Sequence, residues 1–181
     1  MPEKIAVKNY LVSYLSSPES TRQDKQVVKM MILLLAKIAK LAWFDDADIK
    51  NGLVPDLSKI LMSNSNEHRL VGLEAIDQLV VEMTYMTKMK NLTLNRRVSL
   101  SFRDSALYEI FKNNLHFTKT LLEQLNNEFG QNSMQVIIDS LAICLETYLK
   151  CMQFDFVAIL LNETLDEPSQ TNVPAAWVPL I

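Results

Sequence analysis

The sequence predicts an all-α fold in which consecutive helices form pairs. Apolar residues recur three or four positions apart along most of the chain, which is the spacing of one helix face. No segment alternates apolar and polar residues as a half-buried strand would, and only three of the 181 residues are glycine. The helix pairs begin about fifty residues apart, close to the period of HEAT and armadillo repeats. We therefore expect about three pairs in a HEAT/armadillo-type solenoid, although the periodicity also fits a closed helical bundle.

The first pair is expected at about residues 3–42, with helices over 3–16 and 21–42. Ser20, followed three residues later by Gln23, resembles the capping box that opens a helix. The second helix of this pair is therefore predicted to begin immediately after Ser20.

That second helix contains an apolar run, Val27–Phe44, that lysines interrupt. A membrane span needs about twenty nearly uncharged residues, so insertion into a membrane is not expected. At 100° per residue, Lys25, Lys29, Lys37 and Lys40 fall within an arc of about 120°. The second helix of each repeat lines the concave face of a solenoid, so these four lysines are our candidate partner-binding residues. The alternative is an ordinary solvated helix face.

The second pair is expected at about 53–86, preceded by a turn over 44–52. Its helices are predicted over 53–62 and 65–86, and Pro55 would lie in the first turn, where proline is tolerated.

The third pair is expected within about 95–153, with helices over 101–125 and 132–153. Ser101, with Asp104 three residues on, mimics a capping box and would place a carboxylate at the positive end of the helix dipole. We therefore interpret this stretch as the opening of a helix.

Two further features near that opening carry charge. Arg96 and Arg97 are expected in an exposed turn. Arg103 and Asp104 are adjacent and could suggest a clamp for an anion, but neighbouring residues point apart on a helix, which favours a structural role. After the third pair we expect a polar, acidic loop over 154–173 and the start of another helix over 174–181, so that 1–181 forms a single repeat segment.

No catalytic, cofactor-binding or metal site is expected. His68 and His116 fall on different predicted helices without other ligands at suitable spacing. An aspartate-rich stretch from Asp46 resembles a calcium loop but lacks the glycine at its sixth position and the glutamate at its twelfth. Cys144 and Cys151, seven apart on one helix, are beyond disulfide reach and are expected to be reduced core thiols. A net charge of -3 gives no sign of a nucleic-acid binder.

Three stretches resemble one known family in the same order and at compatible spacing. They are "KIAKLAWFDD", "NRRVSLSFRDSALYEIF" and "CMQFDFVAILLNETLDEPSQTNVPAAW". They are similar to segments of the importin-β (karyopherin) nuclear transport receptors, in the exportin-seven branch, also called Ran-binding protein sixteen. The exportin-four branch is related.

The resemblance implies a HEAT-repeat superhelix that binds Ran-GTP and protein cargo, contacts nuclear pore proteins and shuttles between nucleus and cytoplasm without catalysis. It also implies that the chain is a fragment from the N-terminal region of a longer receptor. The alternative is a self-contained helical-repeat scaffold that binds other proteins and has no role in transport.

Overall fold

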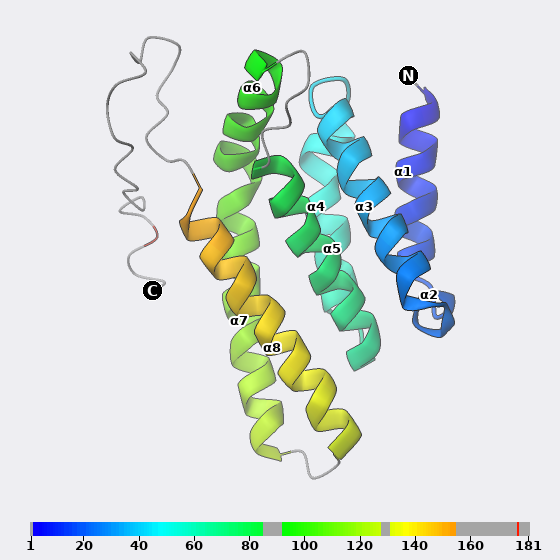
Figure 1. Ribbon diagram of the computed structural model, residues 1–181, viewed down its shortest axis with the longest axis vertical. Helices are drawn as coiled ribbons and strands as arrows, with labels where there is room; N and C mark the ends of the chain where they lie inside the picture. The colour runs from blue at the N-terminus through cyan, green and yellow to red at the C-terminus, as the bar shows by residue number, and fades with distance from the viewer. Residues whose placement is uncertain (1, 85–91, 128–130, 155–176, 178–181) are drawn as a thin grey trace.

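The chain is all-α in the computed structural model, which confirms the predicted fold class (Figure 1). The structure describes residues 2–84, 92–127, 131–154 and 177, and within these ranges it contains no strand. The elements are α1 (Pro2–Leu15), α2 (Glu19–Arg22), α3 (Lys25–Ala42), α4 (Ala47–Leu61), α5 (Asn66–Thr84), α6 (Leu92–Phe102), the π-helical turn η1 (Arg103–Leu107), α7 (Tyr108–Asn127) and α8 (Gln131–Met152).

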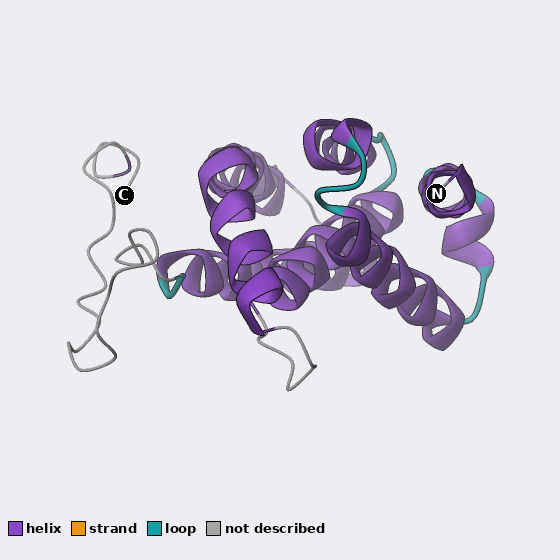
Figure 2. Cartoon of the chain, turned by 90° about the horizontal axis from the view of Figure 1, so that it is seen from above, coloured by secondary structure: helices purple, strands orange, loops and turns teal. Residues whose placement is uncertain are grey.

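The helices form two layers, which Figure 2 shows from above. Helices α1, α4 and α7 make one layer, and α3, α5 and α8 make the other. Each helix of the first layer packs on one of the second: α1 on α3, α4 on α5 and α7 on α8. Within the second layer, α5 lies between α3 and α8 and packs against both. This side-by-side stacking of pairs is the arrangement of a solenoid and not of a closed bundle.

Helix α5 is the most enclosed element, because α3, α4 and α8 all pack against it. Its buried residues are therefore spread over more than one face. They are Val71, Gly72, Leu73, Ala75, Ile76, Leu79, Val80 and Met83.

An aromatic cluster joins the end of α3 to the third pair. The Trp43 ring meets Phe102 edge-on, with ring centroids 5.5 Å apart, and Phe102 in turn lies 6.0 Å from Phe154. The indole nitrogen of Trp43 donates a hydrogen bond to Ser101 Oγ at 3.1 Å. All three rings are buried, so the cluster fixes the first pair against the third through both packing and a satisfied indole N–H.

The start of the second helix differs from the prediction. Helix α3 begins at Lys25, and Asp24 caps it by accepting a hydrogen bond from the backbone N–H of Gln26 at 2.7 Å. Ser20 is buried inside the short helix α2, where its hydroxyl donates to the carbonyl oxygen of Ser17 at 2.8 Å. The capping-box prediction was wrong because the Ser20 hydroxyl is used to satisfy the preceding turn.

The predicted turn over 44–52 is also wrong in its second half. Helix α4 begins at Ala47, since the Asp46 carboxylate accepts from the backbone N–H of Asp48 at 2.6 Å and caps the first turn. Ile49 and Leu53, one turn apart, are both buried, so their packing stabilises a helix that begins before residue 53. Pro55 consequently lies inside the helix.

The third pair begins with one long helical stretch and not with a turn. Arg96 and Arg97 lie on α6, and the chain continues through the π-helical turn η1 into α7. Ser101 therefore does not cap a helix: it accepts from Trp43, and its carbonyl oxygen accepts from Ser105 Oγ at 2.7 Å. A π-helical turn is a local widening of the helix that frequently occurs at functional sites.

The expected acidic loop over 154–173 and the expected helix start over 174–181 lie outside the described residues, except for Phe154 and Trp177. Both of these are buried. The Trp177 ring lies 4.7 Å from Phe111 and 5.8 Å from Tyr108, both on the third pair.

Two helical glycines give a test of the α4 boundary. Gly52 lies inside α4, and a Cβ added there would meet no atom within 4 Å, so Gly52→Ala should raise the free energy of unfolding by about 0.5–1 kcal/mol. Gly72 on α5 is the matched control, because an added Cβ would lie 3.2 Å from Ile60 and would cancel this gain. Urea unfolding of both variants measures the difference. A loss of stability in Gly52→Ala would contradict a helix at this position.

Candidate functional site

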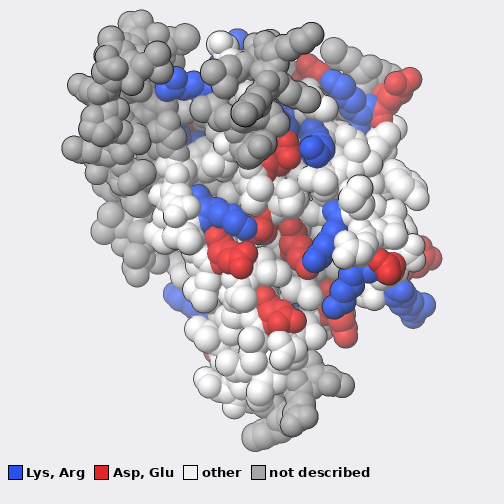
Figure 3. All heavy atoms as spheres, viewed as in Figure 1, with Lys and Arg blue, Asp and Glu red and all other residues white. Residues whose placement is uncertain are grey.

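The structure separates the four candidate lysines into two environments. Lys25, Lys29 and Lys37 are exposed on α3, whereas the side chain of Lys40 is only 7% exposed. Figure 3 shows the face formed by α3, α5 and α8, on which basic and acidic side chains are interspersed. The lysines therefore do not form one uniform basic stripe.

Lys40 reaches across to the last turn of α5. Its ammonium donates to the carbonyl oxygen of Glu82 at 2.7 Å and lies 3.7 Å from the Glu82 carboxylate. The last four carbonyls of a helix lack partners within it, so Lys40 satisfies a group that would otherwise be left unbonded. Burial lowers the pKa of Lys40, and the nearby Glu82 carboxylate opposes that shift. Lys40 thus holds α3 against α5.

Other acidic residues of α5 face basic residues on both neighbouring helices. Burial raises the pKa of Glu74, an effect that Lys29 and Lys25 partly offset. Asp77 accepts hydrogen bonds from Lys150 of α8 at 2.6 Å and from Thr147 at 2.9 Å. The charges of α5 are therefore matched along both seams of the layer.

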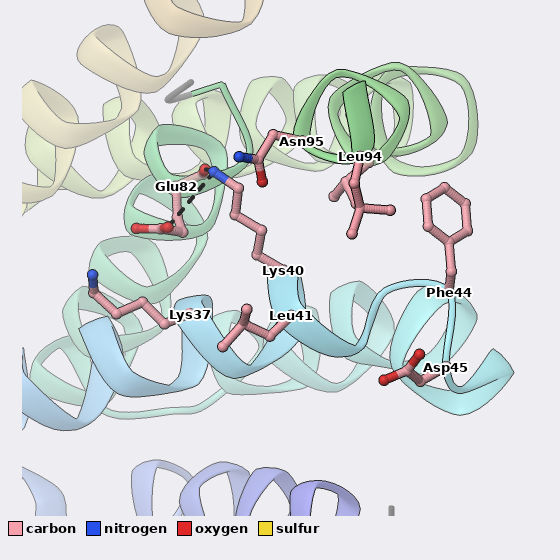
Figure 4. Close-up of a pocket in the computed structure, with 9 residues that line it drawn as sticks. Lys37, Lys40, Leu41, Phe44, Asp45, Glu82, Leu94 and Asn95 are labelled. Atoms are coloured by element: carbon pink, nitrogen blue, oxygen red, sulfur yellow. Dashed lines mark hydrogen bonds and ion pairs between the residues drawn. The ribbon is translucent and has the colours of Figure 1, made fainter. Parts of the chain in front are cut away.

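A small hollow lies where the end of α3 meets α5 and α6 (Figure 4). Its lining residues are Lys37, Lys40, Leu41, Phe44, Asp45, Glu82, Leu94, Asn95 and Val98.

The rim of this hollow is apolar and open to solvent. Leu41 is 66% exposed, Phe44 49% and Leu94 44%. In Figure 4 the Leu94 side chain projects from α6 toward the space between Leu41 and Phe44. The volume of about 170 Å³ is below the 300–1,000 Å³ of typical small-molecule sites. The hollow is therefore smaller than a typical small-molecule site.

The described residues contain no catalytic constellation. His68 Nε2 lies 2.6 Å from the carbonyl oxygen of Ser17, which is a structural contact between pairs, and His116 is exposed. No group of three or more His, Cys, Asp or Glu side chains in the described part of the chain could hold a metal ion. None of the helices described is both long and apolar enough to cross a bilayer.

The two cysteines are free and buried, as the sequence predicts for core thiols. Burial raises the pKa of Cys144 to about 11 and that of Cys151 to about 12. Only the thiolate is nucleophilic, so neither is an activated nucleophile.

Comparison with known proteins gives relatives that match almost the whole chain. Ran-binding protein 16 of Drosophila melanogaster is 28% identical over 99% of this chain, and Exportin-7-A of Xenopus laevis is 29% identical over 98%. Ran-binding protein 17 of Mus musculus is 25% identical over 97%. Along nearly its whole length the chain is thus similar to proteins named Ran-binding protein 16, Ran-binding protein 17 and Exportin-7-A. This confirms the resemblance found in the sequence.

The chain spans only 16% of the length of each of these three relatives. No family model matches the chain, and no solved structure gives a significant match.

The sequence reasoning missed the hollow beside Phe44. It assigned the residues around Arg96 to a turn, so Leu94 was not placed on a helix facing α3. The sequence does contain a pattern that indicates this helix: Leu94, Val98 and Phe102 follow one another four residues apart, and all three lie on α6.

The two environments of the α3 lysines give a stability test. Lys40→Ala should lower the free energy of unfolding by about 1–3 kcal/mol, because it leaves the Glu82 carbonyl and carboxylate without their buried partner. Lys37→Ala, on the exposed side of the same helix, should change it by less than about 0.5 kcal/mol. Denaturant unfolding followed by circular dichroism measures both. Equal effects at the two positions would contradict the burial of Lys40.

The raised pKa values of the thiols predict low reactivity. Folding raises the pKa of both thiols, so the thiolate is rarer in the folded chain than in the unfolded one. Alkylation by iodoacetamide at about pH 8 should therefore be slow in the native protein. Adding denaturant should speed it to the rate of an unfolded thiol. Mass spectrometry of Cys144 and Cys151 follows the reaction, and rapid labelling of the native chain would show that these residues are not buried.

Proposed function

We propose that the chain acts as a non-catalytic segment of a nuclear export receptor that binds Ran-GTP and protein cargo. The observation that supports this most strongly is the similarity along nearly the whole chain to proteins named Exportin-7-A and Ran-binding protein 16. In such a receptor, Ran-GTP and cargo favour the same conformation, so each tightens binding of the other. The receptor would contact nuclear pore proteins and shuttle between nucleus and cytoplasm.

The stacked helix pairs support a role of this kind. Each pair contacts mainly its neighbours, so small rotations between pairs add up to a change in curvature. A binding partner that spans several pairs can therefore select one curvature, which is a way to couple two partners without chemistry.

On α3, we propose that Lys25, Lys29 and Lys37 contact an acidic surface of Ran. These three ammonium groups are exposed, whereas Lys40 is engaged with α5. Exposed charges act mainly on the rate and specificity of association, so the contribution should weaken as salt is added.

The test uses a hybrid of Ran-binding protein 16 of Drosophila melanogaster in which this chain replaces the segment that it matches. We expect the immobilised hybrid to retain Ran loaded with GTP and to release Ran loaded with GDP. Equal retention of both forms would contradict the proposal and would favour a scaffold without a transport role. Circular dichroism and gel filtration of the hybrid check that it folds, and the isolated chain, immobilised in parallel, shows whether this segment binds Ran by itself.

A charge-reversed hybrid tests the lysines. Lys25→Glu with Lys29→Glu should weaken binding of Ran-GTP about tenfold, because attraction becomes repulsion at two exposed positions. Lys112→Glu with Lys119→Glu is the matched control: it makes the same change in charge at exposed positions of α7, in the other layer. Equal effects of the two pairs would indicate a general effect of net charge.

A further inference from the structure

A second, larger hollow adjoins the one between α3, α5 and α6. Its volume is about 810 Å³, and Phe44 lines both. The second hollow extends along α6 toward the π-helical turn η1 and the start of α4. We refer to the two together as the Phe44 surface. The residues of the second hollow used below are Phe44, Lys50, Arg97 and Asp104.

The acidic residues of the Phe44 surface are already paired. Asp45 accepts from Lys4 at 2.9 Å, Asp104 accepts from Arg103 at 2.8 Å, and Glu82 is held by Lys40. Each carboxylate is thus neutralised by a cation that belongs to the fold.

Three cations of the same surface are not used to neutralise these carboxylates. Lys37, Lys50 and Arg97 make no ion pair with any residue that the structure describes. The Arg97 guanidinium lies over the Phe44 ring, 5.6 Å from its centroid, which fixes the group while its N–H edge can still donate to an anion. The surface is therefore locally basic in a chain whose net charge is -3.

Apolar side chains lie among these cations. Leu41, Phe44 and Leu94 are exposed together around the smaller hollow. Their grouping at one place, with cations at its edge, is the pattern of a protein interaction site. Hydrophobic contact would supply affinity, and the cations would select an acidic partner.

We propose that the Phe44 surface binds a short acidic segment of another protein that carries an aliphatic or aromatic side chain. That side chain enters the hollow between Leu41, Phe44 and Leu94. The flanking carboxylates of the segment pair with Lys37 on one side and with Lys50 and Arg97 on the other. This proposal rests on the charges and exposure of this surface alone and does not depend on the role in transport.

The charge pattern favours an acidic peptide over a nucleic acid. A nucleic-acid surface needs an extended basic stripe, and the sequence pI of about 5.4 does not supply one. The Phe44 ring, which could otherwise stack on a base, has Arg97 over it. The exposed leucines also offer nothing to a phosphate backbone.

Fluorescence anisotropy of the whole chain with labelled peptides tests the proposal. The probe carries Leu-Phe flanked on both sides by Asp and Glu. One comparison probe has Lys in place of the acidic residues, and another has Ser in place of Leu-Phe. We expect the first probe to bind at least about tenfold more tightly than either comparison probe, because each lacks one of the two contacts. Equal binding of the acidic and basic probes would overturn the proposal, and so would tighter binding of a labelled single-stranded oligonucleotide.

Two pairs of variants locate the site. Lys37→Glu with Arg97→Glu should weaken binding of the acidic probe about tenfold or more, whereas Lys112→Glu with Lys119→Glu, on the other layer, should leave it unchanged. Leu41→Ser should also weaken it, whereas Leu145→Ser on α8, where leucine is similarly exposed, should not. Circular dichroism confirms that each variant folds. Equal weakening by a variant and its control would overturn the proposal by placing the binding elsewhere.

The outcome is independent of the Ran experiment. If the chain binds the acidic probe but the hybrid retains Ran-GTP and Ran-GDP equally, this inference stands and the proposed transport role is contradicted. The opposite result removes only this inference.

Discussion

Helix α5 is the element on which the other helices depend, because α3, α4 and α8 all pack against it. A helix enclosed in this way can be apolar on several faces but has few positions for charge. Two of its acidic residues lie at the seams with its neighbours, where Lys40 meets Glu82 and Lys150 meets Asp77. Each of these pairs connects two helices of one layer, so the charges help to set how α3 and α8 sit against α5. Burial disfavours the charged form of Lys40, whereas the nearby Glu82 carboxylate favours it. The contact between α3 and α5 therefore has an electrostatic cost as well as a benefit.

The end of α3 shows how a packing constraint creates an exposed surface. Trp43 is buried against Phe102 and bonded to Ser101, which fixes the backbone at this point. The next residue, Phe44, must then point elsewhere, and it lies half exposed beneath Arg97. The aromatic cluster that joins the first pair to the third thus also determines where the Phe44 surface lies. The Phe44 surface lies next to the π-helical turn η1 because Trp43 is bonded to Ser101. Ser101 lies just before that turn, which begins at Arg103.

The described residues form two adjoining hollows at the Phe44 surface. The hollows lie between helices of different pairs, where a change in the angle between pairs would alter their shape. A partner that bound at such a place would therefore be linked to curvature. This linkage is what the proposed transport function requires, and the similarity to Ran-binding proteins and exportins gives it a specific context.

The sequence by itself determined the all-α class and the apolar face of each long helix, because the three- or four-residue spacing of apolar side chains is a local property. It did not determine where α4 begins, that the chain around Arg96 is helical, or that Ser101 receives a bond from Trp43. Those features depend on partners that are distant in the sequence. Lys37 and Lys40 show the same limit: both belong to one lysine-rich face of α3, yet only Lys40 is buried. The difference arises from Glu82, forty-two residues away from Lys40, which only the packing of α5 brings to that side of the helix.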